Sequence, residues 1–321
     1  MGIGRPLVAC LLVTLAIAGA ACSSSGSNAK AGDSGTTRAP NSSTTVATAK
    51  PPYAVSQFTI TYVDATRPTP KNGAYAGAPT RTLPTVVSLP VGAPLPLPLV
   101  VFSTGIDGTG TNYEGLYRHW VAAGYAVAAP VFPLSNAHAP GGSTIADFGS
   151  QPGDVRFVLT KLLLASAAKT GRLAGKLDPA RVALAGKSLG ALTTLRAAYL
   201  VADHEQRERA VISLTGGGEG TGFFTGIKVP LLLEHGDNDH TVPYRSSMDA
   251  FAAAESPKFL VTLFGQDHGG AFNGEDNAAA RVVEVTTLDF LDAYLKGDTT
   301  ALTRLQHDAT VASVASIRSA A

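Results

Sequence analysis

The sequence predicts an α/β fold, in which a mostly parallel sheet of eight strands carries helices on both faces. Three observations lead to this prediction. Short apolar runs recur from about Pro52 onward, helix-like patterns lie between them, and the runs from Leu97 onward are continuously hydrophobic. Such runs are typical of strands buried on both faces of a parallel sheet, and their alternation with helices is typical of α/β proteins. No internal repeat is evident, so we expect one domain over residues 53–321.

The expected strands are the short apolar runs at 57–63, 83–89, 97–103, 125–131, 181–186, 210–215, 229–235 and 258–264. The first two alternate in polarity or lie between Pro-rich turns, as strands at an antiparallel edge do. Amphipathic patterns predict helices at 112–123, 152–169, 189–202, 246–254 and 277–296. The last helix has a natural stop at Gly297, because glycine readily takes the left-handed conformation that ends helices.

Composition limits the classes of partner. The chain has 321 residues, of which 45% are hydrophobic, and this is enough for a large core. Its formal net charge is +1, and no basic stripe follows any expected helix. We therefore expect no nucleic-acid partner.

The N-terminus has the pattern of an export signal. Arg5 precedes an apolar stretch at 7–21 that is too short and too abruptly ended for a membrane span. Small residues then lead to Cys22 and a Ser/Gly-rich segment, which resembles a bacterial lipoprotein signal. The resemblance implies cleavage before Cys22 and lipidation of its thiol, although Gly19 stands where such signals usually carry a larger aliphatic residue. The alternative is an ordinary secretory signal cut near Ala20 or Ala21.

Both interpretations predict an exported protein. The lipoprotein interpretation places it on the outer side of the cytoplasmic membrane, anchored through Cys22. Cys10 is the only other cysteine, so no disulfide is expected. Residues 23–52 have almost no large apolar side chains and cannot offset their ordering entropy by burial. We expect residues 22–52 to form a lipidated, flexible tether.

A candidate nucleophile lies between the expected strand 181–186 and the expected helix 189–202. Ser188 is the serine of a G-x-S-x-G motif at this junction. A serine in a sharp strand-to-helix turn has strained backbone angles, and Gly186 and Gly190 relieve crowding around it. The helix N-terminus also directs the amide of Leu189 toward a developing oxyanion.

A serine nucleophile needs a base and an acid that orients the base. His268 follows the strand at 258–264 among small residues, and it is our candidate for the base. Asp237 and Asp239 follow the strand at 229–235, and Glu219 follows the strand at 210–215. All three carboxylates are candidates for the acid, since open α/β sheets build their sites at the carboxyl ends of strands.

These residues resemble those of the α/β-hydrolase superfamily. The motifs are "GKSLGA", "HGDNDHTVP" and "DHGGAF", in the chain order nucleophile, acid, histidine. The stretches "FTITYVDATRPTP" and "QPGDVRFVLTKL" narrow the resemblance to bacterial proteins similar to platelet-activating-factor acetylhydrolase and dienelactone hydrolase. The similarity covers most of 53–305.

The resemblance implies a role for several positions. It favours Asp239 as the acid, and it implies that the amide of Ile106 is a second oxyanion donor beside Leu189. Many members have His-Gly in the oxyanion loop, where this chain has Thr104-Gly105. Lys187 also departs from the family, which commonly has His or Gln before the serine. It could select anionic substrates, or it could be a solvated surface charge.

The site is expected to be open. Only 51 residues separate Ser188 from Asp239, which leaves no room for a cap domain. We expect Phe223 and Phe224 to lie along the rim of a shallow, partly apolar cleft. No phosphate-binding motif and no metal-ligand spacing is present in the sequence, so no cofactor and no metal are expected.

The sequence therefore predicts an exported serine hydrolase that cleaves short or medium acyl esters, or polymer esters, through an acyl-enzyme. The enzymatic alternatives are a thioesterase or a peptidase with the same triad. The non-enzymatic alternative is a lipoprotein that kept the fold for binding and lost turnover. The oligomeric state is left open.

Overall fold

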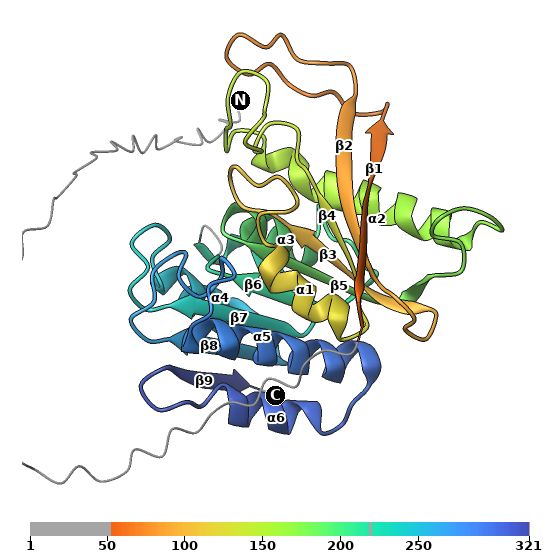
Figure 1. Ribbon diagram of the computed structural model, residues 1–321. Helices are drawn as coiled ribbons and strands as arrows, with labels where there is room; N and C mark the ends of the chain where they lie inside the picture. Colours follow the sequence, from red (N-terminus) through yellow and green to blue (C-terminus); the bar gives the residue numbers. More distant parts are fainter. Residues whose placement is uncertain (1–52, 218–219, 321) are drawn as a thin grey trace, which may run out of the picture. The chain divides into compact units, whose positions relative to one another are not determined.

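A nine-stranded sheet organises the part of the chain that the computed structural model describes, residues 53–217 and 220–320 (Figure 1). The predicted signal at 1–21, Cys22 and the tether up to residue 52 lie outside the described residues, as does Glu219. In spatial order the strands are β1 (Val55–Asp64), β2 (Arg81–Pro90), β4 (Ala126–Pro130), β3 (Leu97–Ser103), β5 (Leu177–Lys187), β6 (Glu208–Leu214), β7 (Leu231–Gly236), β8 (Lys258–Leu263) and β9 (Ala315–Ala320).

The sheet is mostly parallel, as predicted. From β4 through β3, β5, β6 and β7 to β8, every neighbouring pair is parallel. β1 and β2 form the expected antiparallel edge. The prediction of eight strands is wrong by one, because β9 pairs antiparallel with β8 at the other edge. Its sequence, "ASIRSA", has no apolar run, since an edge strand is covered less completely than a central one.

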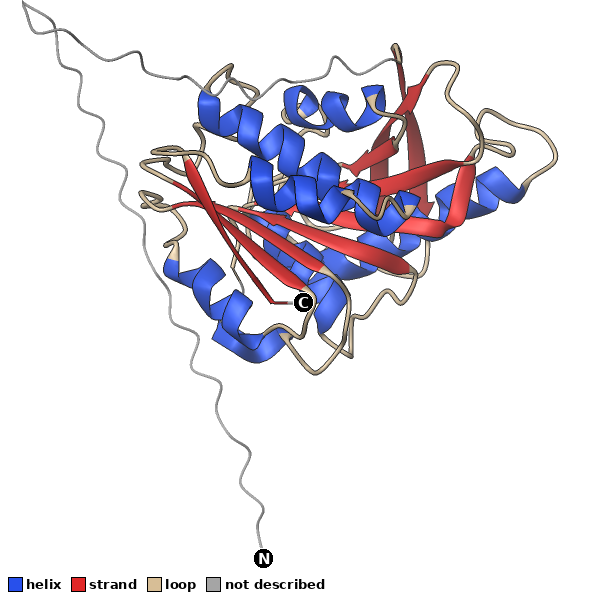
Figure 2. Ribbon diagram, turned by 90° about the horizontal axis from the view of Figure 1, so that it is seen from below, coloured by secondary structure: helices blue, strands red, loops and turns tan. Residues whose placement is uncertain are grey.

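Helices cover both faces of the sheet (Figure 2). On one face lie α1 (Glu114–Ala122), α5 (Ala278–Leu291) and α6 (Ala301–Asp308), and on the other lie α2 (Gln151–Ala167), α3 (Leu189–Tyr199) and α4 (Arg245–Ala253). β3 shows how the strands divide the core. Val100 and Phe102 belong to the first cluster, whereas Leu99 and Val101 belong to the second, since successive side chains of a strand point to opposite faces.

The chain after α5 departs from the expected pattern. A π-helical turn at Asp292–Lys296 continues α5 to Gly297, which has φ 70° and ends the helix as expected. The short α6 that follows was not predicted.

No helix in the described ranges is long and apolar enough to cross a membrane. Between Ser188 and Asp239 the described chain forms α3, β6, a short 3-10 turn and β7, and these elements leave no inserted cap domain there.

Candidate active site

Ser188 occupies the turn between β5 and α3 in a conformation that non-glycine residues rarely adopt. Its φ is 58° and its ψ is −123°. Its amide donates to the carbonyl of Leu214 on β6, and its own carbonyl accepts from the amides of Ala191 and Leu192 in α3. Main-chain bonds to two elements thus hold a residue whose backbone angles are unfavourable, and such strain is often found at functional sites.

The two glycines of the motif make room for this turn. A Cβ atom on Gly190 would lie 2.0 Å from the carbonyl oxygen of Ser103, at the end of β3. A Cβ atom on Gly186 would lie 2.2 Å from the carbonyl oxygen of Gly190. Any larger residue would push these backbones apart. The glycines are therefore required by close main-chain approach around Ser188, and their own φ angles are not in the left-handed region.

His268 joins Ser188 to Asp239. Its Nε2 lies 2.9 Å from Oγ of Ser188, and its Nδ1 lies 2.7 Å from Oδ2 of Asp239. An ionised carboxylate only accepts hydrogen bonds, so Nδ1 carries the proton. Nε2 of a neutral imidazole is then an acceptor, and it can take the proton of the Ser188 hydroxyl. This is the arrangement that a serine nucleophile needs.

The three residues meet because of the topology of the sheet. Ser188, Asp239 and His268 follow β5, β7 and β8, which are all parallel and therefore end at the same edge. The sequence places these residues 51 and 29 positions apart, and only the sheet brings their side chains within hydrogen-bonding distance.

The carboxylate of Asp239 is held on both oxygens. Oδ1 accepts from the amides of Thr241 and Val242, at 2.8 and 2.9 Å. Oδ2 also lies 3.1 Å from Nε2 of His235, which is fully buried. Burial acts to raise the pKa of Asp239, but the hydrogen bonds from His268 and the two amides outweigh it, and the pKa is lowered. Asp239 is thus an anion in position to orient His268.

The other acid candidates are arranged differently. Asp237 is exposed, and its Oδ1 accepts from the amide of Gly265 at 2.6 Å. No hydrogen bond joins Asp237 to His268 in the described part of the chain. Glu219 lies outside the described residues. Of the two aspartates, only Asp239 bonds to the histidine.

Lys187 is buried, with 6% of its surface exposed, so the alternative of a solvated surface charge is wrong. Its Nζ lies 5.8 Å from the ring centre of Tyr113, which precedes α1. Burial lowers the pKa of Lys187 to about 8, although the nearby charges of Asp239 and Asp267 act against this shift. Within the described ranges Lys187 forms no ion pair.

The environment of His268 favours its neutral form. Burial lowers its pKa, and the positive charge of Lys187 lowers it further, while Asp239 acts in the opposite direction. The net shift is below the ordinary value of 6.5. A neutral imidazole is the form that can accept a proton from Ser188.

The loop after β3 passes directly beside the nucleophile. A Cβ atom on Gly105 would lie 3.2 Å from Cβ of Ser188 and 3.1 Å from the hydroxyl of Tyr113. The next residue, Ile106, is partly exposed. Within the part of the chain that the structure describes, the amides of Ile106 and Leu189 donate to no other group. Both amides are therefore available as hydrogen-bond donors near Ser188.

Phe223 and Phe224 pack against aromatic side chains outside the group formed by Ser188, His268 and Asp239. The ring of Phe224 packs on Tyr199 with centroids 5.0 Å apart, and Tyr199 is the last residue of α3, about 16 Å along the helix from Ser188. Phe223 packs on Phe148 at 6.3 Å. Both rings join the partly buried side chains over the second core cluster. Their place along the rim of the cleft stays a prediction.

Two residues near the triad were not singled out from the sequence. Tyr113 lies beside Gly105 and Lys187, and nothing in "TNYEGLY" marks it. The second is His235, which shares Oδ2 of Asp239 with His268. Its place in "HGDND", four residues before Asp239, is the only signal that could have indicated this.

Comparisons of the sequence with models of protein families and with curated proteins find no match to this chain.

Proposed function

We propose that this protein is a serine esterase of the α/β-hydrolase superfamily, similar to the bacterial relatives of platelet-activating-factor acetylhydrolase and dienelactone hydrolase. The observation that carries the proposal is the hydrogen-bonded series from Ser188 Oγ through His268 to Asp239, at 2.9 and 2.7 Å. The order of strands, the turn at Ser188 and the two unpaired amides beside it support the same assignment.

The reaction follows from the proton positions. Ser188 Oγ attacks the ester carbonyl while its proton moves to Nε2 of His268. The amides of Leu189 and Ile106 stabilise the negative oxygen that forms, which is commonly the largest contribution to such catalysis. His268 then gives the proton to the departing alcohol, leaving an acyl group on Ser188. Water, deprotonated by His268, releases the acid and restores the hydroxyl.

Asp239 keeps the proton of His268 on Nδ1 throughout these steps. It also stabilises the imidazolium that exists while His268 holds both protons. Because its carboxylate is fixed by Thr241 and Val242, the imidazole ring has one orientation toward Ser188.

The proposed substrates are carboxylic esters with short or medium acyl groups, or polymer esters. The absence of a cap domain in the described chain between Ser188 and Asp239 supports an open site that a polymer surface can reach. We also propose that the protein is exported and held at the outer side of the cytoplasmic membrane through lipidated Cys22. Mass spectrometry of the mature N-terminus would test the lipid directly, with Cys22→Ser as the control.

The function is tested with p-nitrophenyl butyrate and a fluorophosphonate probe. We expect stoichiometric labelling of Ser188 and loss of both labelling and hydrolysis in Ser188→Ala. Ser143→Ala is the matched control, because Ser143 is an exposed serine in the loop after β4 with no bond to Ser188, His268 or Asp239 in the described chain, and it should behave as wild type. Full activity of Ser188→Ala would refute the proposal, and absence of labelling in the wild type would favour the binding lipoprotein. Matched ester, thioester and amide substrates distinguish the esterase from a thioesterase or a peptidase.

A further inference from the structure

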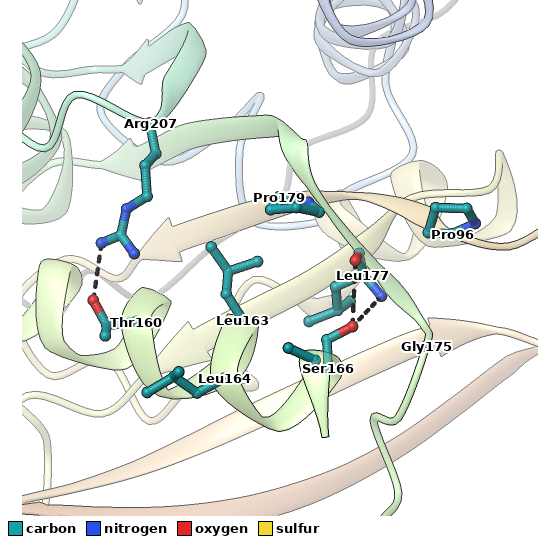
Figure 3. Close-up of a pocket in the computed structure, with 10 residues that line it drawn as sticks. Pro96, Thr160, Leu163, Leu164, Ser166, Gly175, Leu177, Pro179 and Arg207 are labelled. Atoms are coloured by element: carbon teal, nitrogen blue, oxygen red, sulfur yellow. Dashed lines mark hydrogen bonds between the residues drawn. The ribbon is translucent and has the colours of Figure 1, made fainter. Parts of the chain in front are cut away.

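A groove lies at the amino ends of the central strands, whereas Ser188 lies at their carboxyl ends. Figure 3 shows the residues that line this groove. It has a volume of about 570 Å³ and is formed by the last turns of α2, the start of β5 and the turn before β3. Its lining is mainly apolar, with Pro96, Leu163, Leu164, Leu177 and Pro179 around it. Figure 3 shows Leu163 and Leu164 on the helix beneath Pro179, with Pro96 farther along the same side.

Large apolar side chains are exposed around this groove. Leu164 is 61% exposed and Leu95 is 56% exposed. Val91, which begins the turn that ends at Pro96, is 55% exposed. Leu164 lines the groove, and Leu95 directly precedes Pro96, which also lines it. A contiguous exposed apolar patch marks a surface that contacts a partner.

The same region is strongly basic. The segment 156–181 contains six lysines and arginines and a single acidic residue, Asp178, in a chain whose net charge is only +1. Asp178 is already bound to Arg181. In the described chain, the remaining basic groups on this segment form no ion pair; they include Lys161, Lys169, Arg172 and Lys176. We call these four residues, together with Val91, Leu95 and Leu164, the basic apolar face.

The loop that carries the basic groups is fixed against the sheet. The guanidinium of Arg172 lies 4.1 Å from the ring centre of Phe58 on β1. Arg181 donates to the carbonyl of Pro96 at 2.6 Å and so ties β5 to the turn before β3. These two contacts hold the loop after α2 and the turn before β3 against the sheet, next to the groove.

The chain enters the domain at this surface. The carbonyl of Ala54 accepts from the amide of Val91 at 2.8 Å, and Val55 pairs with Pro90 in β2. The first described residues of the chain therefore lie beside Val91.

We propose that the basic apolar face docks on an anionic lipid bilayer. Lysine and arginine side chains attract anionic headgroups, while Val91, Leu95 and Leu164 enter the headgroup boundary. The exposed aliphatic side chains favour a bilayer over a nucleic acid, which is bound through phosphate contacts and aromatic stacking. This proposal is independent of the esterase activity.

Docking in this way would fix the orientation of the triad. Pro96, Gly175 and Arg207 line the groove at the amino ends of β3, β5 and β6, whereas Ser188 follows the carboxyl end of β5. The seven residues of β3 alone span about 23 Å from the amino end to the carboxyl end of the strand. A docked domain would hold Ser188 on the side away from the bilayer, open to substrates that arrive from the water.

The test measures which edge meets the membrane. A polarity-sensitive fluorophore is attached to Leu164→Cys or, as the control, to Ile145→Cys, in the full chain with Cys10 and Cys22 changed to serine. Ile145 is also exposed, at 66%, but it lies in the loop after β4, at the carboxyl edge of the sheet. Removal of Cys22 separates the result from lipidation.

With vesicles containing phosphatidylglycerol, we expect the label at 164 to shift to the blue and to be quenched by spin-labelled lipid at least twofold more than the label at 145. Phosphatidylcholine vesicles should give no difference between the two sites. The charge reversal Lys169→Glu with Lys176→Glu should remove the response and leave hydrolysis of p-nitrophenyl butyrate in solution unchanged. Lys71→Glu, an exposed loop lysine elsewhere, should keep both.

Three results would overturn the proposal. The first is equal quenching at positions 164 and 145, and the second is an equal response to neutral and anionic vesicles. The third is a response to single-stranded DNA without a response to anionic vesicles, which would assign the face to nucleic acid.

Discussion

Oδ2 of Asp239 lies 2.7 Å from Nδ1 of His268. The carboxylate of Asp237, two residues earlier, instead accepts from the amide of Gly265. We expect Asp239→Asn to lower kcat by about 10³- to 10⁴-fold, because an amide in place of the carboxylate no longer fixes the tautomer of His268. Asp237→Asn keeps an acceptor for Gly265 and should retain nearly full activity. Steady-state hydrolysis of p-nitrophenyl butyrate compares the two variants, and the assignment of the acid is wrong if their effects are reversed.

Ser188→Gly should make the protein more stable and inactive at once. Glycine adopts φ 58° and ψ −123° without the steric cost that serine bears. Such strain is worth about 1–3 kcal/mol, so the free energy of unfolding should rise by an amount in that range. Ser188→Ala removes the hydroxyl and keeps Cβ, and it is the matched control for the lost hydrogen bond to His268. Thermal unfolding of both variants gives the comparison; a glycine variant less stable than the alanine variant would contradict strain at this turn.

Lys187→Met should move the acid side of the pH profile to higher pH. Hydrolysis requires neutral His268, so kcat/KM falls as the pH drops through the pKa of this histidine. Burial and the charge of Lys187 lower that pKa below 6.5, and removal of the charge lets it rise. Methionine fills the buried site without charge. The profile of kcat/KM against pH measures the change, with the exposed Lys228→Met as the control; an unmoved acid limb would show that Lys187 does not act on His268.

Glu234→Gln should remove a loss of stability at neutral and higher pH. Burial raises the pKa of Glu234 to about 8, although the hydrogen bond from Thr286 acts to lower it. The unfolded chain binds fewer protons than the folded one between 4.5, the ordinary value, and about 8. Stability therefore falls as the pH rises through this window.

Chemical denaturation at pH 5 and pH 8 tests this effect. From about 1.4 kcal/mol per pKa unit, the decrease in unfolding free energy between the two pH values should be about 2–4 kcal/mol smaller in Glu234→Gln than in the wild type. An equal decrease in both proteins would show that Glu234 does not titrate with folding.

Sequence patterns were sufficient to predict the centre of the sheet and to single out the three residues that the structure joins by hydrogen bonds. The run at 97–103 has the bounds of β3, because a strand buried on both faces must be apolar throughout. Ser188 could be placed from its immediate neighbours, since Gly186 and Gly190 meet main chain and no side chain fits there. His268 is indicated by its place after the expected strand at 258–264, whereas only the resemblance to α/β-hydrolases favours Asp239 over Asp237 and Glu219.

Features that depend on distant contacts were missed. The edge strand β9 and the short α6 have no strong hydrophobic periodicity in their own sequences. β9 forms by pairing with β8, and α6 forms by packing into the core cluster that also contains α5. Lys187 lies against Tyr113, which is far from it in sequence and immediately precedes α1. Phe224 packs at the far end of α3 because Tyr199 offers a ring there. None of these partners is adjacent in sequence.

The close approach of Gly186, Gly190 and Ser103 has a consequence for engineering. Backbone from β3, β5 and α3 approaches closely around Ser188, and the hydroxyl of Thr194 also lies beside Gly186. Repacking of core residues away from this junction can therefore change stability without displacing the Ser188 hydroxyl, since close main-chain contacts position the turn. Surface loops could therefore be exchanged to alter substrate selectivity while Gly186, Gly190 and Ser103 are kept unchanged. A library of variants that keeps these backbone contacts should contain a high fraction of active proteins.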